Sequence, residues 1–210
     1  MNQMGAILRN PAPPWRFYEF FAGGGMVSAG LGAGWTCAFA NDICPDKAAA
    51  WRANWGQDGP LTVGDVAALT TADLPGRPDL AWASSPCQDL SLAGRRAGLG
   101  GGRSGAFWPF WRLMLGLADE GRAPPIVAVE NVAGLMTSNG GADLAALVRA
   151  MAAGGWRVGA LVVDAALFAP QSRPRLFVLG FGCGAAPPPR ALSPGPVARW
   201  HPPALATAAA

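Results

Sequence analysis

Short apolar runs alternate with longer segments of mixed polarity along most of the chain. The first run, Phe17–Phe21, ends at a cluster of glycines that suits a tight turn. Later runs of similar length are bounded by Pro, Gly or polar residues, and they are Thr36–Ala40, Leu80–Ala83, Ile126–Val129, Val158–Val163 and Leu176–Leu179. Apolar runs of this length between turn residues predict buried strands.

Three longer segments between these runs predict helices. Asp46–Asn54 begins with an acidic residue suited to an N-cap, Ser104–Asp119 is rich in aromatic residues, and Asp143–Ala153 stops at a pair of glycines. Because strands and helices alternate, we expect an α/β fold with a mostly parallel sheet and helices on both faces.

Length and composition favour one ordered domain. The chain has 210 residues, and its 29 glycines and 20 prolines are balanced by a hydrophobic content of 51% that includes nine Trp and nine Phe. Such a chain can build a core, so we expect a loop-rich globular protein rather than a disordered one. The segment 182–210 holds seven prolines, no acidic residue and an alanine-rich end. It reads as an irregular tail without a core of its own.

The net charge and the lack of targeting signals narrow the range of expected partners and cellular locations. The net charge of +3 comes almost entirely from arginine, which permits a nucleic-acid partner without requiring one. Residues 1–15 lack the apolar stretch of a signal peptide, and the uncharged segment 20–41 contains six glycines. We read that segment as a strand, turn and helix rather than a membrane span, and we expect a cytoplasmic protein with no membrane contact.

The cysteines do not form a metal or disulfide pattern. The four of them include no C-x-x-C pair, and His201 is the only histidine. We therefore expect free thiols and no metal.

The glycine turn after the first strand is a candidate ligand site. It reads Phe21-Ala-Gly-Gly-Gly-Met26, and Asp42 follows Gly23 by nineteen residues at the end of the next strand. Turn glycines let a ligand approach the backbone, and a carboxylate at this position can accept ribose hydroxyls. The pattern alone does not identify the ligand, since an NAD site would look much the same.

A cysteine follows the Leu80–Ala83 strand, in the segment Ser85-Pro-Cys-Gln88. The carboxyl edge of a parallel sheet is where ligands bind, and nearby arginines at positions 95, 96 and 103 favour the reactive thiolate. A buried structural thiol is the alternative, and this segment by itself leaves both readings open.

Two further segments carry polar residues to the same edge. Glu130 and Asn131 end the Ile126–Val129 run, where a carboxylate could act as an acid partner to a thiol. Arg173 and Arg175 precede the last strand and share one face if that segment is extended. They could bind a phosphate or a base carbonyl, or be surface charges.

Taken together and in this order, these motifs resemble the cytosine-C5 DNA methyltransferases. The resemblance covers about residues 16–181, which would be the catalytic and cofactor-binding domain, preceded by an N-terminal extension over 1–15. Its segments are Phe21–Gly25, Asn41-Asp42, Gly64–Val66, Pro86–Gln88, Arg103–Gly105, Glu130–Val132 and Gln171–Arg175.

The resemblance implies a Rossmann-like methyltransferase fold that uses S-adenosyl-L-methionine. The turn formed by Phe21, Ala22, Gly23, Gly24 and Gly25 would hold the methionine part of the cofactor. Asp42 would take the ribose hydroxyls, Ile43 would pack on the adenine, and Asp65 with Val66 would read the adenine edge.

The resemblance also implies the chemistry and its residues. The Cys87 thiolate would attack C6 of a cytosine flipped out of DNA, and Glu130 would contact the N3 edge of the base. Arg173 and Arg175 would hold the base carbonyl and the catalytic loop, and residues 88–103 would close over the base. Pro86, Gln88 and Asn131 complete the implied catalytic set. The products would be methylated DNA of the kind found in restriction–modification systems.

Two departures from the family pattern keep alternatives open. Met26 stands where the turn usually has its last glycine, and a target-recognition region and two later motifs have no counterpart in the tail. A split enzyme with a second subunit, a truncated chain, an inactive cofactor-binding remnant and an RNA methyltransferase are all compatible with this. An NAD-dependent oxidoreductase would leave the cysteine and arginine motifs unexplained.

Overall fold

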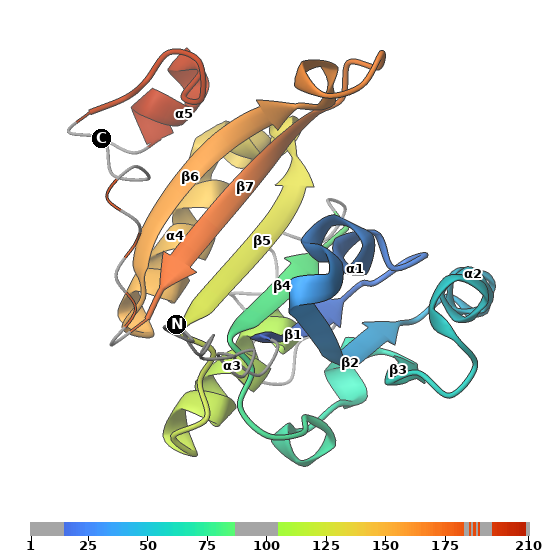
Figure 1. Cartoon of the computed structure of the whole chain (residues 1–210). Helices are drawn as coiled ribbons and strands as arrows, with labels where there is room; N and C mark the ends of the chain where they lie inside the picture. Colours follow the sequence, from blue (N-terminus) through green and yellow to red (C-terminus); the bar gives the residue numbers. More distant parts are fainter. Residues whose placement is uncertain are drawn as a thin grey trace, which may run out of the picture.

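A seven-stranded sheet runs through the computed structural model, which describes residues 15–86, 105–182, 185, 187, 189 and 195–208 (Figure 1). The strands lie in the order β3-β2-β1-β4-β5-β7-β6. Their bounds are β1 Trp15–Phe20, β2 Trp35–Asp42, β3 Leu61–Val63, β4 Leu80–Ser84, β5 Ile126–Val132, β6 Arg157–Asp164 and β7 Pro174–Phe181. All contacts among β1 to β5 are parallel, and only β7 runs antiparallel to its neighbours β5 and β6. The prediction of a mostly parallel α/β sheet is confirmed.

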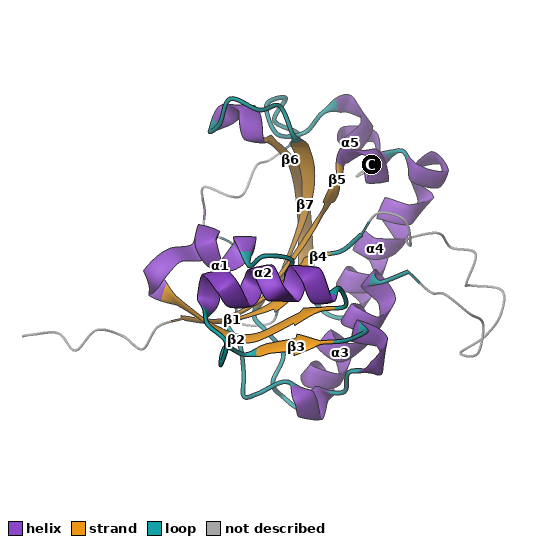
Figure 2. Cartoon of the chain, turned by 90° about the vertical axis from the view of Figure 1, so that its right-hand side faces the viewer, coloured by secondary structure: helices purple, strands orange, loops and turns teal. Residues whose placement is uncertain are grey.

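Helices cover both faces of the sheet (Figure 2). Those following β1 and β2 lie on one face, and those following β4 and β5 lie on the other. The helix bounds are α1 Met26–Leu31, α2 Pro45–Trp55, α3 Phe107–Asp119, α4 Ala142–Ala153 and α5 Pro203–Ala208.

The alternation of side chains along β1 explains why this strand lies at the centre. Tyr18 and Phe20 are fully buried in the main core beneath α3 and α4, whereas Phe17 is buried on the opposite face with Leu80. A strand that is apolar on both faces belongs inside a sheet covered by helices on both sides. This arrangement places the end of β1, and the turn that follows it, in the middle of the molecule.

Two local predictions differ from the structure. Helix α2 begins at Pro45 with Cys44 at the N-cap, so Asp46 is not the cap but an acidic residue of the first turn. Proline suits the first helical position because it has no N–H that would go unpaired there. Strand β3 was not expected, because its three residues are partly or fully exposed and it exists only through pairing with β2.

Part of the C-terminal segment packs on the sheet rather than remaining irregular. Pro203–Ala208 forms α5, and Leu205 is 4% exposed within the main core. The amide of Val162 in β6 donates to the carbonyl oxygen of Trp200 at 2.8 Å. Within the described part of this segment, a short helix and the side chain of Leu205 therefore join the core of the domain, where an irregular tail was expected.

None of the helices in the described part of the chain has the length and apolarity needed to cross a bilayer.

Candidate active site

The carboxyl ends of the parallel strands bring the predicted site residues to one edge of the sheet. In the register of the sheet, Phe20 lies beside Asn41 and Ala83, and Ser84 lies beside Glu130. Val132 in turn pairs with Arg175 on the antiparallel strand β7. Segments separated by up to 155 residues of sequence, from Phe20 to Arg175, thus meet at the edge where α/β proteins bind ligands.

The glycine turn has an unusual backbone that β2 holds in place. Phe21, Gly23 and Gly25 have positive φ angles of 58°, 55° and 81°. Residues other than glycine rarely adopt such left-handed backbone angles, and Phe21 is one of the few that do so here. The Asp42 carboxylate accepts the Gly23 amide at 2.8 Å through Oδ2 and the Cys44 amide at 2.9 Å through Oδ1. Asp42 is 4% exposed, so the residue expected to take ribose hydroxyls also fixes the turn.

Glu19 is a site residue that the sequence reasoning missed. It is 1% exposed, and its carboxylate accepts the Val27 amide at 3.0 Å and the Ser28 hydroxyl at 2.7 Å, which fixes the start of α1. Burial raises the pKa of this carboxyl, and its hydrogen bonds with Ser28 and Val27 only partly offset that effect. The signal available in the sequence was a single carboxylate inside the apolar run of β1.

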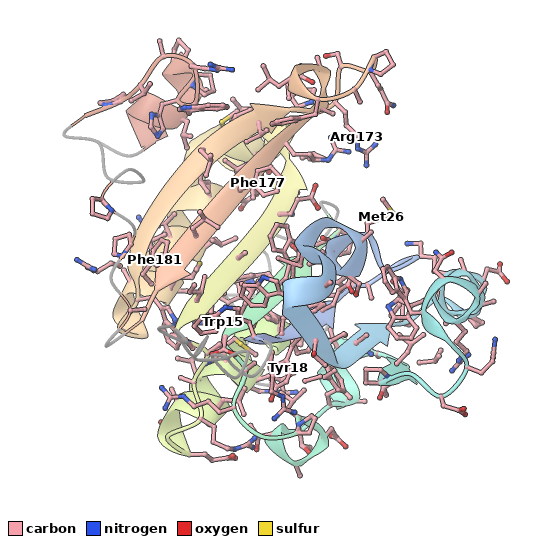
Figure 3. The ribbon with its side chains drawn as sticks, in the orientation of Figure 1. Trp15, Tyr18, Met26, Arg173, Phe177 and Phe181 are labelled. Carbon is pink, nitrogen blue, oxygen red and sulfur yellow. The ribbon has the colours of Figure 1, made fainter. Side chains whose placement is uncertain are left out.

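The other predicted cofactor residues differ in how much of them a ligand could reach. Ile43 is 63% exposed, and Asp65 is exposed with Oδ1 accepting the Ala67 amide at 2.8 Å. The Val66 side chain is 4% exposed in the main core, so only its backbone could contact a ligand. Met26 begins α1 with 75% of its side chain exposed, and it lies across the edge from Arg173 (Figure 3).

Glu130 and Arg175 form an ion pair at the end of β5. Arg175 Nε lies 2.9 Å from Glu130 Oε1, and the two side chains are 21% and 20% exposed respectively. Since both keep some solvent access, the pair forms a partly open charged site rather than a sealed one. The structure thus joins two motifs that are 45 residues apart and that the sequence analysis assigned to one site.

Asn131 anchors the strand end that leads to the cysteine. Its Nδ2 donates to the Ser85 carbonyl oxygen at 3.0 Å and to Ser85 Oγ at 3.2 Å, and its Oδ1 accepts the Val132 amide. Asn131 is 3% exposed, so its side chain acts on Ser85 rather than facing solvent. Pro86 follows as an exposed residue, while Cys87, Gln88 and the rest of the loop to residue 104 lie outside the described residues.

The β6–β7 connection holds Arg173 at the same edge. The Asp164 carboxylate accepts from the amides of Ala166 and Arg173 and from the Ser172 hydroxyl at 2.8 Å. The Ala166 and Arg173 amides and then the Ser172 hydroxyl lower the pKa of Asp164. Arg173 itself is exposed and lies just before β7, so only Arg175 of the two arginines reaches Glu130.

Of the two described thiols, Cys37 is a poor candidate for the nucleophile. Burial, and then the nearby charge of Glu19, raises the pKa of Cys37 to about 12. A thiol with such a pKa stays protonated at neutral pH and is a poor nucleophile. Cys44 is half-buried at the start of α2. Among the described residues no three His, Cys, Asp or Glu side chains gather as a metal site.

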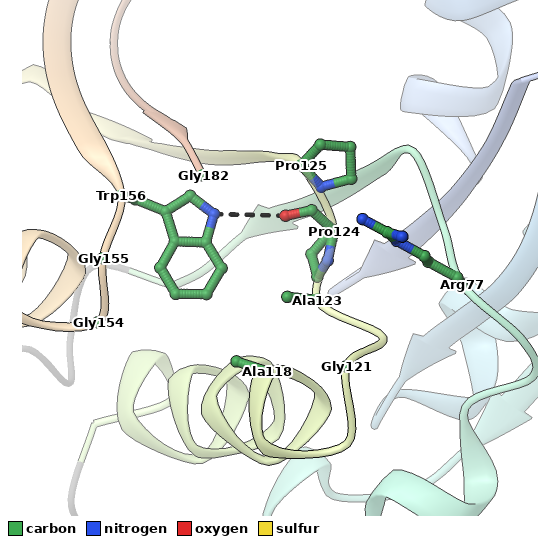
Figure 4. Close-up of a pocket in the computed structure, with 10 residues that line it drawn as sticks. All are labelled: Arg77, Ala118, Gly121, Ala123, Pro124, Pro125, Gly154, Gly155, Trp156 and Gly182. Atoms are coloured by element: carbon green, nitrogen blue, oxygen red, sulfur yellow. Dashed lines mark hydrogen bonds between the residues drawn. The ribbon is translucent and has the colours of Figure 1, made fainter. Parts of the chain in front are cut away.

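A separate hollow lies at the opposite edge of the sheet (Figure 4). Its lining includes Arg77 before β4, Pro124 before β5 and Trp156 before β6, and Trp156 Nε1 donates to the Pro124 carbonyl oxygen at 3.3 Å. These positions precede the parallel strands, whereas the predicted site residues follow them. The hollow is therefore distinct from the candidate active site.

A comparison with known protein families shows which family this chain is related to. The family of C-5 cytosine-specific DNA methylases matches residues 15–198. The chain belongs to this family. Relatives of this methylase-family chain include the type II methyltransferase M.BsuFI of Bacillus subtilis, 29% identical over 167 residues, and the type II methyltransferase M.NlaX of Neisseria lactamica, 28% identical over 171. These matches cover 79% and 80% of this chain but 39% and 52% of the two relatives.

Solved structures agree on the fold of this C-5 cytosine methylase chain. The S. pombe Dnmt2 methyltransferase superposes with a TM-score of 0.66 at 21% identity, covering 82% of this chain and 52% of that one. A putative DNA modification methyltransferase encoded in an E. coli prophage gives 0.62 at 22% identity, covering 80% and 47%. The chain thus spans about half the length, or less, of these relatives.

Proposed function

We propose that this chain carries the cofactor-binding and catalytic machinery for methylating C5 of cytosine in DNA, with S-adenosyl-L-methionine as the methyl donor. The observation that carries the proposal is the Glu130–Arg175 ion pair, which lies beside the strand end leading into Cys87. Membership of the C-5 cytosine-specific DNA methylase family supports the same reaction.

The residues at the cofactor end of the site fit S-adenosyl-L-methionine. Each oxygen of the Asp42 carboxylate accepts one amide, which leaves lone pairs for two ribose hydroxyls. Ile43 offers an exposed apolar surface for a flat base, and Asp65 has a second oxygen for an adenine amino group. When bound, this cofactor supplies an electrophilic methyl group.

The protein's own part of the chemistry centres on Cys87. Its thiolate forms a bond to C6 of the cytosine, and the electron pair displaced from the C5–C6 double bond makes C5 nucleophilic. Glu130, held by Arg175, contacts the N3 edge and stabilises the negative charge that develops on the ring by donating a proton or a hydrogen bond to N3. After C5 gains the methyl group it loses its proton to a base, the Sγ–C6 bond breaks, and the thiolate is restored.

This chemistry requires a base outside the duplex. The atoms to be attacked lie within the base stack, so the cytosine must be flipped into the site. Arg173 is exposed two residues before Arg175, and in this proposal it would meet the base carbonyl or the nucleic-acid backbone. We further propose that choosing a target sequence needs protein segments beyond these 210 residues, for example on a second subunit.

Covalent capture of a 5-fluorocytosine oligonucleotide tests the proposal. Fluorine at C5 cannot leave as a proton would, so the wild-type protein should form a complex that resists denaturing electrophoresis in the presence of S-adenosyl-L-methionine. Cys87→Ala should form none, while the control Cys183→Ala should retain capture.

Two comparisons complete the experiment. Matched DNA and RNA oligonucleotides identify the nucleic acid, and any polypeptide encoded beside this one is added as a candidate partner. If the wild type captures neither oligonucleotide under any of these conditions, the chain is not an active methyltransferase.

A further inference from the structure

Two side chains from the end of α2 converge on one carbonyl of the glycine turn. Asn54 Nδ2 lies 2.9 Å and Trp55 Nε1 lies 3.2 Å from the carbonyl oxygen of Gly24, thirty residues earlier in the chain. This oxygen therefore has both of its lone pairs engaged by side-chain donors. The arrangement fixes the peptide unit that joins Gly24 to Gly25.

The same peptide unit is fixed from its other side by the turn itself. The Gly25 amide donates to the Ala22 carbonyl oxygen at 2.9 Å, and the Gly23 amide donates to Asp42 Oδ2 at 2.8 Å. Both donors to the Gly24 carbonyl oxygen come from α2, whereas the Gly23 and Gly25 amides donate to Asp42 of β2 and to the Ala22 carbonyl within the turn. The Gly24 carbonyl is therefore where α2 is attached to this turn. Without them, three consecutive glycines would leave this backbone free to sample many conformations.

The identity of Gly25 is tied to Trp55. A Cβ atom on Gly25 would overlap the Trp55 indole and would come within 3.0 Å of Trp51. Gly25 also has a φ of 81°, which side-chain-bearing residues rarely adopt. The glycine is thus required by the indole that lies against it as well as by its own backbone.

Neither donor is part of the core. Asn54 is exposed and Trp55 is 41% exposed, whereas Trp51, one turn earlier, is 1% exposed and attaches α2 to the sheet. Exposed neutral hydrogen bonds contribute little to the free energy of unfolding, because water replaces them in the unfolded chain. Their effect is therefore concentrated on the shape of the turn.

We propose that Asn54 and Trp55 are positioning residues that hold the Gly24–Gly25 peptide in the conformation that binds the cofactor. The inference rests on the proposed function, in which this turn receives the methionine part of S-adenosyl-L-methionine. A turn already held in its bound shape spares the ligand the entropic cost of ordering it.

Titration calorimetry with S-adenosylhomocysteine measures this effect without catalysis. Wild type is compared with Asn54→Ala, Trp55→Phe, the double variant and the control Gln57→Ala, an exposed residue just beyond α2. Each single variant leaves the Gly24 carbonyl one donor, so affinity should fall roughly threefold. The double variant leaves none, and its affinity should fall by more than the product, about twentyfold or more.

Two further measurements separate positioning from stability. The melting temperatures of the free proteins should stay close together, and hydrogen exchange should quicken in the double variant over residues 21–27 but not within β4 or β5. Asn54→Gln, which keeps an amide donor, should recover part of the affinity.

The possible failures are distinguishable. If the wild type binds S-adenosylhomocysteine and the double variant binds it equally well, the positioning role is wrong while the proposed function stands. If affinity falls only in step with a lowered melting temperature, the two residues are structural. If the wild type binds no S-adenosylhomocysteine, the proposed cofactor, and with it this inference, is rejected.

Discussion

Glu19 and Glu130 show how surroundings divide the work of two carboxylates at one sheet edge. Glu19 is buried beneath α1 and accepts hydrogen bonds from Val27 and Ser28, which shape the backbone next to the glycine turn. Glu130 keeps a fifth of its side chain exposed and pairs with Arg175. The buried carboxylate is therefore suited to holding the local backbone in place, and the accessible one is suited to contact with a substrate.

Glu19 should make stability depend on pH. Because burial raises its pKa above 4.5, the folded state favours the protonated carboxyl, so its contribution is complete below pH 4.5 and is lost as pH rises through the raised pKa. Glu19→Gln cannot ionise. The free energy of unfolding of wild type minus that of Glu19→Gln should therefore decrease from pH 4.5 to pH 8, as measured by urea denaturation. A difference that rises or stays constant with pH would contradict this assignment.

Arg175→Ala should impair methylation far more than folding. The substitution removes the cation that orients Glu130, and we expect covalent capture to slow by about 10- to 100-fold. The pair is partly exposed, so the loss in unfolding free energy should be at most about 1 kcal/mol. Capture rates and melting curves measure the two effects, with exposed Arg149→Ala as the control. An unchanged capture rate would remove Arg175 from the site.

At the scale of the elements, β5 controls the geometry of its neighbour β4. Asn131 at the end of β5 reaches across to the carbonyl and hydroxyl of Ser85, directly before Pro86 and Cys87. Sequence reasoning placed Asn131 in the catalytic set, because it follows Glu130 in the family motif. The contact that explains its presence depends on the parallel pairing of two strands 46 residues apart, which no local pattern reveals.

Asn131→Ala should therefore destabilise the protein and impair capture together. It leaves the buried Ser85 carbonyl and hydroxyl without their partner, which costs about 1–3 kcal/mol. Asn131→Asp keeps the shape and the acceptor for Val132 but loses the donor, so it should also lose capture. Chemical denaturation and capture of the 5-fluorocytosine probe measure both effects. Wild-type capture by both variants would show that Ser85 needs no anchor.

Several elements were predicted because their pattern is local. Helix α4 was expected over Asp143–Ala153 and runs Ala142–Ala153, since its apolar periodicity and the glycines that end it are adjacent in sequence. Strand β3 was not predicted, because it depends on pairing with β2, and the start of α2 was placed one residue late although Pro45 at the first helical position is itself a local signal. The same holds for the candidate site. Its motifs could be predicted from the sequence, but the roles of Glu19 and of the two side chains that donate to Gly24 could not.

At the scale of the whole molecule, residues far along the chain complete the core. Leu205 packs among side chains of the main core, and the backbone of Trp200 pairs with β6. Leu205→Ala removes a buried side chain, so it should weaken the packing of the C-terminal segment on the domain by about 2–4 kcal/mol. Trypsin should then cleave faster after Arg199, while Val197→Ala, with a side chain that is 40% exposed, should behave as wild type. Equal cleavage of all three proteins would contradict this packing.

The sequence by itself determined the α/β class, the order of the motifs and the residues proposed for chemistry, because strand length, turn glycines and motif spacing are local properties of the chain. The tertiary structure alone decided which motifs touch. It paired Glu130 with Arg175, set Asn131 on Ser85, buried Glu19 under α1 and brought Asn54 and Trp55 to Gly24. Most of these contacts join residues far apart in sequence, and they form where the carboxyl ends of the parallel strands meet the amino end of the antiparallel strand β7 at one edge of the sheet.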